Sequence, residues 1–244
     1  MLLLVLAIPC GARGASTETN DPLQSLNRKT YAFNEGLDKY ILRPVARGWD
    51  FVAPDIIEDS LRNFDDNIRF PIIAVNDILQ WKWRAATEQT GRFVVNTTVG
   101  ILGFRDVAAG WGLAKQNEDS GQTFGKWGIP AGPYLVLPLF GPSNPRDAIG
   151  LLADGALSIY WLAAPLYVTL PYRTVDVVNR RALADEDIES ARKAALDFYV
   201  FMRNAYRQRR NALIRDVAET GTGAAAIDDN LYDVDDPYEL DDEE

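Results

Sequence analysis

Residues 127–145 read WGIPAGPYLVLPLFGPSNP, which is 19 residues without a charge but with prolines at positions 130, 133, 138, 142 and 145. Because proline lacks the backbone N–H and clashes with the preceding turn, this stretch cannot form a regular helix. A hairpin with two arms of about eight residues would reach about 26 Å, close to the ~30 Å hydrocarbon thickness of a bilayer. Composition alone leaves three alternatives open: a buried loop, an interfacial hairpin or an interrupted transmembrane helix.

The chain before this stretch has the pattern of many short helices. Apolar residues recur at helical spacing after Asp21 and Pro22, which we expect to be the N-cap and the first helical position. Prolines at positions 44, 54 and 71 divide the pattern, and we expect Asp55 to cap the third helix. The glycine-rich residues 100–125 are expected to form a loop or closely packed backbone. The expected helices span residues 22–41, 44–52, 55–64, 72–79 and 85–99.

Two further segments follow the proline-rich stretch. Residues 148–171, AIGLLADGALSIYWLAAPLYVTLP, carry a single charge, Asp154, and are interrupted by Pro165. Because the tract is broken near its end, we favour a buried core helix over a spanning helix, with partial membrane insertion as a third alternative. Residues 187–217 are expected to form one long amphipathic helix. Its other face is rich in arginine, which suits either solvent or an anionic lipid surface.

Charge and composition exclude several functional classes. The formal net charge is −10, but residues 227–244 alone carry ten carboxylates, so the other 25 acidic residues balance the 25 Lys and Arg. A neutral body argues against nucleic-acid binding, which needs a concentrated basic face. The absence of histidine removes the commonest general base and metal ligand. The single cysteine, Cys10, allows no intramolecular disulfide and no cysteine-rich metal site. We therefore predict no cofactor and no metal.

The N-terminus has the pattern of an export signal. Residues 2–9, LLLVLAIP, are too few to span a bilayer but long enough for the core of a signal peptide. No basic residue precedes them, so the sequence also allows a signal that begins upstream of Met1. Two ways of processing remain open: acylation of Cys10 after signal removal, or cleavage after Gly14. A third alternative is a buried N-terminal core segment.

The sequence contains no recognisable catalytic motif. Gly-x-Ser-x-Gly does not occur, and there is no Walker loop or dinucleotide fingerprint. Capping and solvation explain the carboxylate pairs at 65–66, 118–119 and 185–187 better than acid–base work or calcium binding. We predict that the protein is not an enzyme. Tryptophans border the apolar tracts as interfacial anchors do, although core packing is the commoner role of any one of them. They are Trp81, Trp83, Trp111, Trp127 and Trp161.

Five blocks of sequence, taken in order, carry a family resemblance. They are DPLQSLNRKTYAFN (21–34), LDKYILRPVARGW (37–49), NFDDNIRFPIIAVNDILQ (63–80), RFVVNTTVGILGFRDVA (92–108) and EDSGQTFGKWGIPAGPYLVLPLFGPSNPRD (118–147). Together they resemble the MlaA (VacJ) family of outer-membrane phospholipid-handling lipoproteins over roughly residues 21–165. Agreement of several ordered blocks is far more specific than any single motif.

This resemblance implies a fold, a function and partners. The fold would be mainly α: a ring of short amphipathic helices, seated in the inner, periplasm-facing leaflet of the outer membrane, with an axial amphipathic channel and a proline-rich hairpin beside it. The function would be removal of misplaced phospholipid from the outer leaflet. The partners would be phospholipid, a trimeric porin, and the periplasmic lipid-binding chaperone MlaC, which residues 187–240 would meet.

The resemblance also assigns roles to particular residues. Cys10 would be the lipid anchor, although its lipobox is weak. Phe33 and Asn34 fall in the N-terminal helix motif of the family. The remaining predicted channel and hairpin residues are Tyr134, Leu135, Leu137, Pro138 and Phe140.

The expected organisation is a signal peptide over residues 1–14, a helical lipid-handling domain over 21–217 and a flexible acidic tail over 218–244. Two other functions compete with lipid transport. The first is a structural envelope lipoprotein that tethers layers or stabilises porins, which should carry no stoichiometric phospholipid. The second is a carboxylate-dependent lipid hydrolase, which would cleave its substrate, whereas a channel returns it intact.

Overall fold

The computed structural model of the chain describes residues 21–158 and 164–217. This part of the chain is mainly helical, which confirms the predicted class, and it contains one two-stranded sheet. The expected signal peptide, Cys10, Trp161 and the acidic tail lie outside the described residues.

The first helices form a continuous curved segment. It consists of α1 (Gln24–Leu37), the π-helical turn η1 (Asp38–Leu42) and α2 (Arg43–Val52), with Pro44 in the first turn of α2. The predicted N-cap is wrong: α1 begins after Leu23, not at Pro22, and has no side-chain cap. Asp21 instead accepts hydrogen bonds from Asn27 and from Tyr199 of the last helix, so a tertiary contact takes the carboxylate that capping would have used.

The next three helices agree with the proline pattern. They are α3 (Asp55–Ile68), α4 (Phe70–Leu79) and α5 (Trp83–Thr98). Pro71 lies in the first turn of α4, where its missing N–H has no intrahelical acceptor to lose. Asp55 is the first residue of α3 and does not cap it, which corrects the expected role. Phe70 and Phe93 stack with ring centroids 4.4 Å apart and join α4 to α5.

The glycine-rich segment contains more helix than expected. Besides the short α6 (Val107–Gly110), residues Ser120–Lys126 form α7, which Asp119 caps by accepting a hydrogen bond from the Gln122 N–H at 2.8 Å. The expected close packing of backbone does occur: a Cβ added to Gly150 of α8 (Pro145–Leu157) would lie 2.4 Å from the backbone nitrogen of Gly121. Only the loop alternative is wrong, over residues 120–126: these glycines lower helix propensity, but they also permit contact between two helices.

The proline-rich stretch forms a hairpin, one of the three alternatives, but a short one. Strands β1 (Leu135–Leu137) and β2 (Gly141–Ser143) pair antiparallel, with Leu135 opposite Ser143 and Leu137 opposite Gly141. Three residues span about 10 Å, so the expected reach of about 26 Å is wrong. The turn lies next to Gly141, whose φ of 78° is in the left-handed region that glycine adopts without strain.

The described part of the apolar tract at 148–171 is not a buried core helix. Residues Pro145–Leu157 form α8 and Leu166–Leu183 form α10, with residues 159–163 outside the described part. Several large apolar side chains of both helices are exposed, including Leu152 at 75% and Tyr167 at 79%. In the described residues no helix is both long enough and apolar enough to cross a membrane. The apolar side chains of α8 and α10 therefore belong to exposed surface and cavity wall.

The predicted long C-terminal helix is two helices. α11 (Asp185–Ala194) ends before Leu196, and α12 (Phe198–Ile214) begins after Asp197, which accepts hydrogen bonds from the N–H groups of Tyr199 and Val200. The spacing of apolar residues continues across the break, so periodicity alone could not reveal it.

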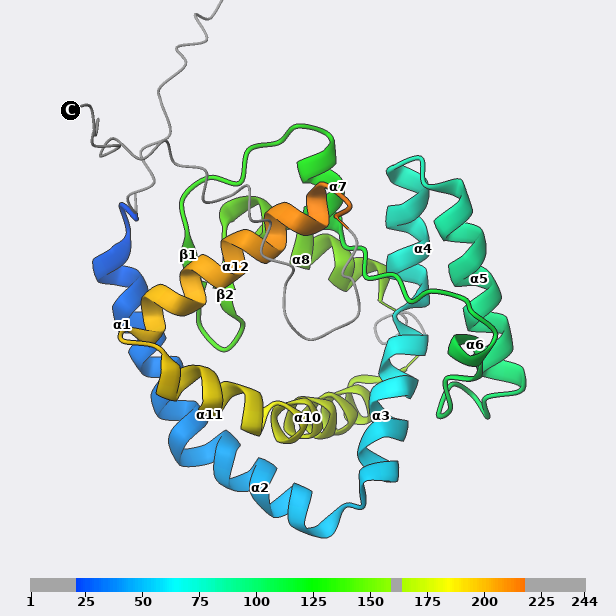
Figure 1. Cartoon of the computed structure of the whole chain (residues 1–244), viewed down its shortest axis with the longest axis horizontal. Coiled ribbons are helices and arrows are strands. Elements are labelled where there is room, and N and C mark those ends of the chain that lie inside the picture. The colour runs from blue at the N-terminus through cyan, green and yellow to red at the C-terminus, as the bar shows by residue number, and fades with distance from the viewer. Residues whose placement is uncertain (1–20, 159–163, 218–244) are drawn as a thin grey trace, which may run out of the picture.

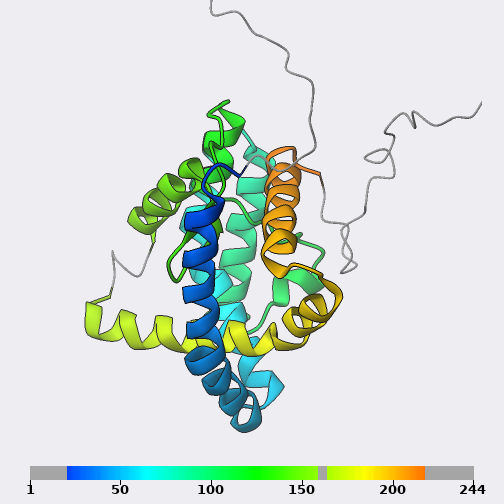
Figure 2. The same ribbon diagram turned by 90° about the vertical axis from the view of Figure 1, so that its left-hand side faces the viewer.

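The helices are arranged around a central space (Figure 1). α1, α2, α3 and α4 follow one another along the periphery, α10 and α11 lie alongside α2, and α12 crosses from α1 towards α7. The hairpin lies within this arrangement. Figure 2 shows α10 running crosswise to α1. Buried apolar clusters are small: Ala46 of α2 packs on Val178 and Ala182 of α10, and Tyr134 and Val136 pack on Tyr199.

Candidate lipid-binding cavity

A large cavity lies among the helices. Its volume is about 1720 Å³, and its walls come from α1, η1, the α3–α4 junction, the hairpin, α8, α10, α11 and α12. The walls are predominantly apolar, with leucine, isoleucine and phenylalanine side chains from most of these elements. Representative lining residues are Ile41, Leu137, Phe140, Leu151, Leu170, Val177 and Met202.

Charged groups also line this cavity, and most of them are paired. Arg181 of α10 donates to both oxygens of Asp38 at 2.6 and 3.1 Å, and Arg192 of α11 pairs with Glu35 of α1. The hydrogen bond with Glu35 is the main cause that raises the pKa of Arg192. Pairing keeps these charges stable beside apolar walls, since a lone charge there would lose hydration without compensation. The cavity is thus amphipathic.

Two asparagines of α1 hold the hairpin against the helix. Asn27 donates to the Tyr134 carbonyl oxygen at 2.9 Å and accepts from the Val136 N–H at 3.0 Å. Asn34 repeats this arrangement, donating to the Leu137 carbonyl and accepting from the Leu139 N–H, both at 2.9 Å. Each primary amide thereby replaces the pairing that a neighbouring strand would give β1. Side chains of a helix therefore satisfy the backbone hydrogen-bonding groups along this edge of the hairpin.

The structure brings together five of the predicted site residues. Asn34, Tyr134, Leu137, Pro138 and Phe140 all line the cavity. Burial raises the pKa of Tyr134 to about 12, so its hydroxyl remains neutral.

Two predicted residues lie outside the lining. Leu135 is on β1 next to the buried Val136 but is not part of the cavity wall, and Phe33 is 55% exposed on another face of α1. Cys10 lies outside the described residues.

Sequence reasoning missed most of the polar groups of the site. Asn27 could have been found, because it stands two helical turns before Asn34 and therefore on the same face of α1. The sequence contains no pattern that would identify the paired charges of the lining, since the two members of each pair are more than 140 residues apart in the chain. These charges are Glu35, Asp38, Arg181 and Arg192.

The last helix is fastened at both of its ends. Near its start, Arg28 of α1 pairs with the capping residue Asp197 at 2.6 Å. Near its end, Arg210 donates to both oxygens of Asp119 at 2.6 and 3.0 Å and pairs with Asp147 at 2.8 Å. Burial opposes ionisation of Asp119, but the hydrogen bonds from Arg210 hold its pKa below the ordinary value. These contacts hold α12 across the cavity.

The carboxylate pairs singled out in the sequence have structural partners. Asp65 and Asp66 lie next to Arg180, and Asp66 also pairs with Lys115 at 2.5 Å. Glu118 pairs with Lys82 at 2.8 Å. Among the described residues no group of three or more metal-ligating side chains is arranged to hold a metal ion.

Four of the five border tryptophans fall in the described residues, and all four are more than half exposed: Trp81, Trp83, Trp111 and Trp127. The Trp127 indole N–H donates to the Leu79 carbonyl oxygen at 3.2 Å. An exposed ring with its N–H satisfied is an arrangement found in side chains that sit at an interface.

A family model described as MlaA lipoprotein matches residues 19–213. The chain belongs to the MlaA lipoprotein family. The matched range extends from before α1 to within one residue of the end of α12, so it covers every wall of the cavity.

Curated relatives agree with this MlaA assignment. The Escherichia coli (strain K12) protein named intermembrane phospholipid transport system lipoprotein MlaA is 33% identical over 239 residues, covering 94% of each chain. The Haemophilus influenzae protein of the same name is 31% identical over 225 residues, covering 90% of this chain and 89% of its own.

A solved structure shares the fold. It comes from work on the structural basis for maintenance of bacterial outer membrane lipid asymmetry, and it matches this MlaA-family chain with a TM-score of 0.71 at 31% identity. The match covers 80% of this chain and all of the other.

Proposed function

We propose that this chain binds phospholipid in its central cavity and transports it. In this proposal the protein resides in the periplasm-facing leaflet of the outer membrane, takes misplaced phospholipid from the outer leaflet and passes it to a periplasmic carrier. The family membership, the names of the relatives and the amphipathic cavity support this function.

The size and lining of the cavity are the main support for lipid binding. A phospholipid combines long apolar chains with a charged head group, so a protein that moves it needs an apolar space joined to polar groups. The volume of about 1720 Å³ exceeds the 300–1,000 Å³ typical of sites for small molecules, and its walls supply both kinds of group. Downhill movement between leaflets breaks no bond and needs no nucleotide. The proposal therefore assigns no catalytic residue.

The exterior supports membrane seating. Many large apolar side chains are exposed on the outer helices, among them Phe51 at 91% and Val52 at 75%. Soluble proteins rarely expose contiguous apolar patches of large area, so such surfaces favour contact with lipid or protein. Docking to a trimeric porin and delivery to MlaC rest on the family resemblance and belong to the same proposal. Cys10 remains the proposed lipid anchor.

The test compares two neighbouring leucines of β1. Leu137→Asp places a carboxylate in the cavity wall, whereas Leu135→Asp places it on the same strand outside the lining. A carboxylate facing acyl chains loses hydration without a partner, so we expect Leu137→Asp to lose most co-purified phospholipid. We expect Leu135→Asp to retain it.

The measurement is the stoichiometry of phospholipid in detergent-extracted protein, by native mass spectrometry and thin-layer chromatography. Wild-type protein without stoichiometric phospholipid would contradict transport and favour a structural tether. Cleavage of added labelled phospholipid would favour a hydrolase. Equal retention by both variants would show that Leu137 does not contact the lipid.

A further inference from the structure

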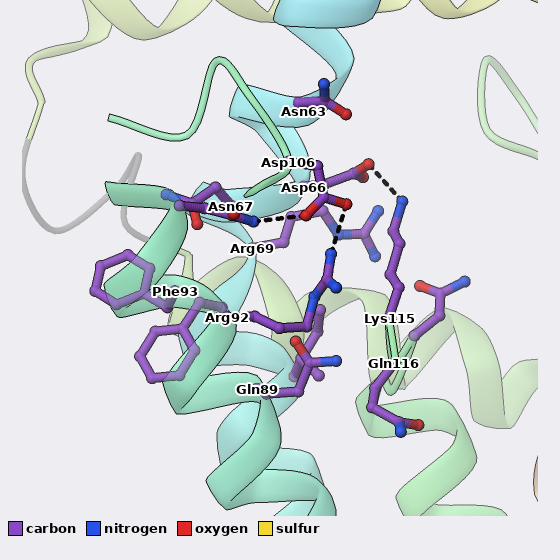
Figure 3. Close-up of a pocket in the computed structure, with 14 residues that line it drawn as sticks. Asn63, Asp66, Asn67, Arg69, Gln89, Arg92, Phe93, Asp106, Lys115 and Gln116 are labelled. Atoms are coloured by element: carbon purple, nitrogen blue, oxygen red, sulfur yellow. Dashed lines mark hydrogen bonds and ion pairs between the residues drawn. The ribbon is translucent and has the colours of Figure 1, made fainter. Parts of the chain in front are cut away.

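A second, much smaller pocket adjoins the central cavity. It lies between α3, α4, α5 and the segment before α7, and its volume is about 40 Å³ (Figure 3). This is room for a few water molecules or one phosphate group, and far too little for an acyl chain. Its lining is mostly polar, including Asn63, Asp66, Asn67, Gln89, Arg92 and Lys115.

Arg69 belongs to both spaces. It is the residue between α3 and α4, where the helix ends and restarts ahead of Pro71. Its side chain lines the small pocket and also the central cavity, beside Ile68 and Ile72 of the cavity wall. A ligand whose apolar part occupies the cavity would therefore meet Arg69 on its way to the polar pocket.

Arg69 differs from the other arginines of the cavity. Arg181 and Arg192 are paired with Asp38 and Glu35, and Arg173 lies 3.6 Å from Asp65. Across residues 21–158 and 164–217, the guanidinium of Arg69 has no carboxylate or hydrogen-bond acceptor as a partner. Since a guanidinium presents five donors in a fork that fits phosphate oxygens, its unmet donors point to an anionic ligand.

A second donor in the pocket is also unmet. Gln89 is 5% exposed, and its Nε2 has no hydrogen-bond partner among the described residues. The acidic groups of the pocket are already neutralised: Asp66 pairs with Lys115 and Asp106 with Arg92 at 2.7 Å. Figure 3 shows these pairs as dashed lines among the lining side chains. Arg69 and Gln89 therefore supply free donors, which a phosphate would satisfy.

We propose that Arg69, with the polar pocket behind it, binds the phosphate of a phospholipid head group while the acyl chains lie in the central cavity. This inference rests on the proposed function and names the part of the lipid that the site recognises. A charge-assisted pair between guanidinium and phosphate is strong when partly shielded from water, so it would orient the lipid head-first at the α3–α4 junction.

The test measures binding of three probes to delipidated full-length protein in a phosphate-free detergent. They are dihexanoylphosphatidylglycerol, dihexanoylglycerol, which has the same acyl chains but no phosphate, and inorganic phosphate. We expect wild-type protein to prefer the phospholipid over dihexanoylglycerol by roughly ten- to hundred-fold, the worth of hydrogen bonds to a charged group. Arg69→Gln should lose this preference and keep its affinity for dihexanoylglycerol. Arg69→Lys should recover part of it.

The matched control is Arg62→Gln, a substitution two turns earlier on α3 at an arginine that lines neither space. It should leave all three affinities unchanged. Inorganic phosphate should bind weakly, because it gains nothing from the apolar cavity. Thermal unfolding checks that each variant folds. If Arg69→Gln does not fold, comparing the three probes on wild type and Arg69→Lys still tests whether Arg69 binds the phosphate.

Three results would overturn the inference. They are an unchanged preference in Arg69→Gln, equal wild-type affinity for the two lipids, and Arg69-dependent binding of inorganic phosphate as tight as that of the phospholipid. The last would identify an anion site unrelated to lipid. Wild-type protein that binds neither lipid would instead contradict the proposed function itself, so the two failures are distinguishable.

Discussion

Asp77 of α4 is fully buried, and neither of its carboxylate oxygens has a hydrogen-bond partner among the described residues. Burial raises its pKa to about 7, and the nearby charge of Glu118 adds to the increase while Lys82 opposes it. Polar side chains such as Asn76, Gln122 and Asn179 are buried as completely, so the interior contains many polar groups. Such an interior depends on satisfied hydrogen bonds, and Asp77 is a point where they are missing.

The raised pKa of Asp77 predicts a specific dependence of stability on pH. The unfolded carboxyl titrates near pH 4, so between about pH 4 and pH 7 the folded state binds the extra proton, and stability falls as pH rises through this range. Asp77→Asn keeps the group neutral at every pH. The difference in unfolding free energy between the variant and wild type should therefore increase by about 2–3 kcal/mol in favour of the variant as pH rises from 5 to 8.

Denaturant unfolding of both proteins at pH 5 and pH 8 checks this prediction. Asp187→Asn, at an exposed position in the first turn of α11, is the control and should track wild type within about 0.5 kcal/mol. If the difference between Asp77→Asn and wild type is the same at both pH values, Asp77 is ionised in the folded protein.

At the scale of elements, the hairpin depends on a match between helix and strand dimensions. Asn27 and Asn34 are seven residues apart, which is about 10.5 Å along α1 at 1.5 Å per residue. The carbonyls that they bind belong to Tyr134 and Leu137, three residues apart and about 10 Å along an extended chain. The two amides therefore meet the strand at equivalent points, and the pair sets the register of hairpin on helix.

Truncating Asn27 should loosen this attachment. Asn27→Ala leaves the buried Tyr134 carbonyl and Val136 N–H without partners, which should cost about 2–4 kcal/mol of unfolding free energy. The same change at the half-buried Asn34 should cost less, because water can reach the freed groups. Denaturant unfolding measures the loss, and hydrogen exchange at Val136 should speed up. Lys29→Ala, on the exposed face of α1, should change stability little, and an equal loss there would refute the special role of Asn27.

The pattern of elements was predictable where local signals are strong. Prolines at 44, 54 and 71 placed the early helix boundaries because proline is favoured near a helix start, although Pro171 lies inside α10. The break between α11 and α12 was missed because the apolar spacing continues across it. Helix α7 was missed because Gly121 and Gly125 lower propensity, a cost that packing against α8 offsets.

At the scale of the whole molecule, α12 connects parts of the chain that are far apart in sequence. It contacts α1 through Asp197 and through the ring of Tyr199 on Tyr31, and it contacts α7 and α8 through Arg210. Just beyond it, Asp216 pairs with Lys82 and with Lys126. Figure 1 shows this helix crossing from α1 towards α7. It therefore closes the wall of the cavity.

Removing the cation that holds α12 should destabilise the molecule. Arg210→Gln leaves the partly buried Asp119 without a cationic partner and Asp147 with Arg146 alone, and breaking a buried ion pair typically costs about 3–5 kcal/mol. Arg84→Gln is the control, because this arginine is 93% exposed and water screens its pair with Glu88. Thermal or denaturant unfolding of the two variants tests the difference. Equal stability would show that water compensates the charge of Asp119 and that Arg146 suffices for Asp147.

The sequence by itself determined the helical class, the early helix boundaries, the hairpin as one of three alternatives and the family resemblance, which the family match confirms. These follow from local rules of periodicity, proline and ordered motifs, which act within a few residues.

Only the tertiary structure decided which side chains share the cavity. It placed Leu137 in the wall and Leu135 outside it, paired Arg181 and Arg192 with carboxylates of the first helices, and left Arg69 without a partner among the described residues. Charge pairs between residues more than 100 positions apart leave no periodic trace in the chain. The sequence cannot show these pairs because the desolvation cost and the electrostatic attraction of the two charges arise only when folding removes both from water.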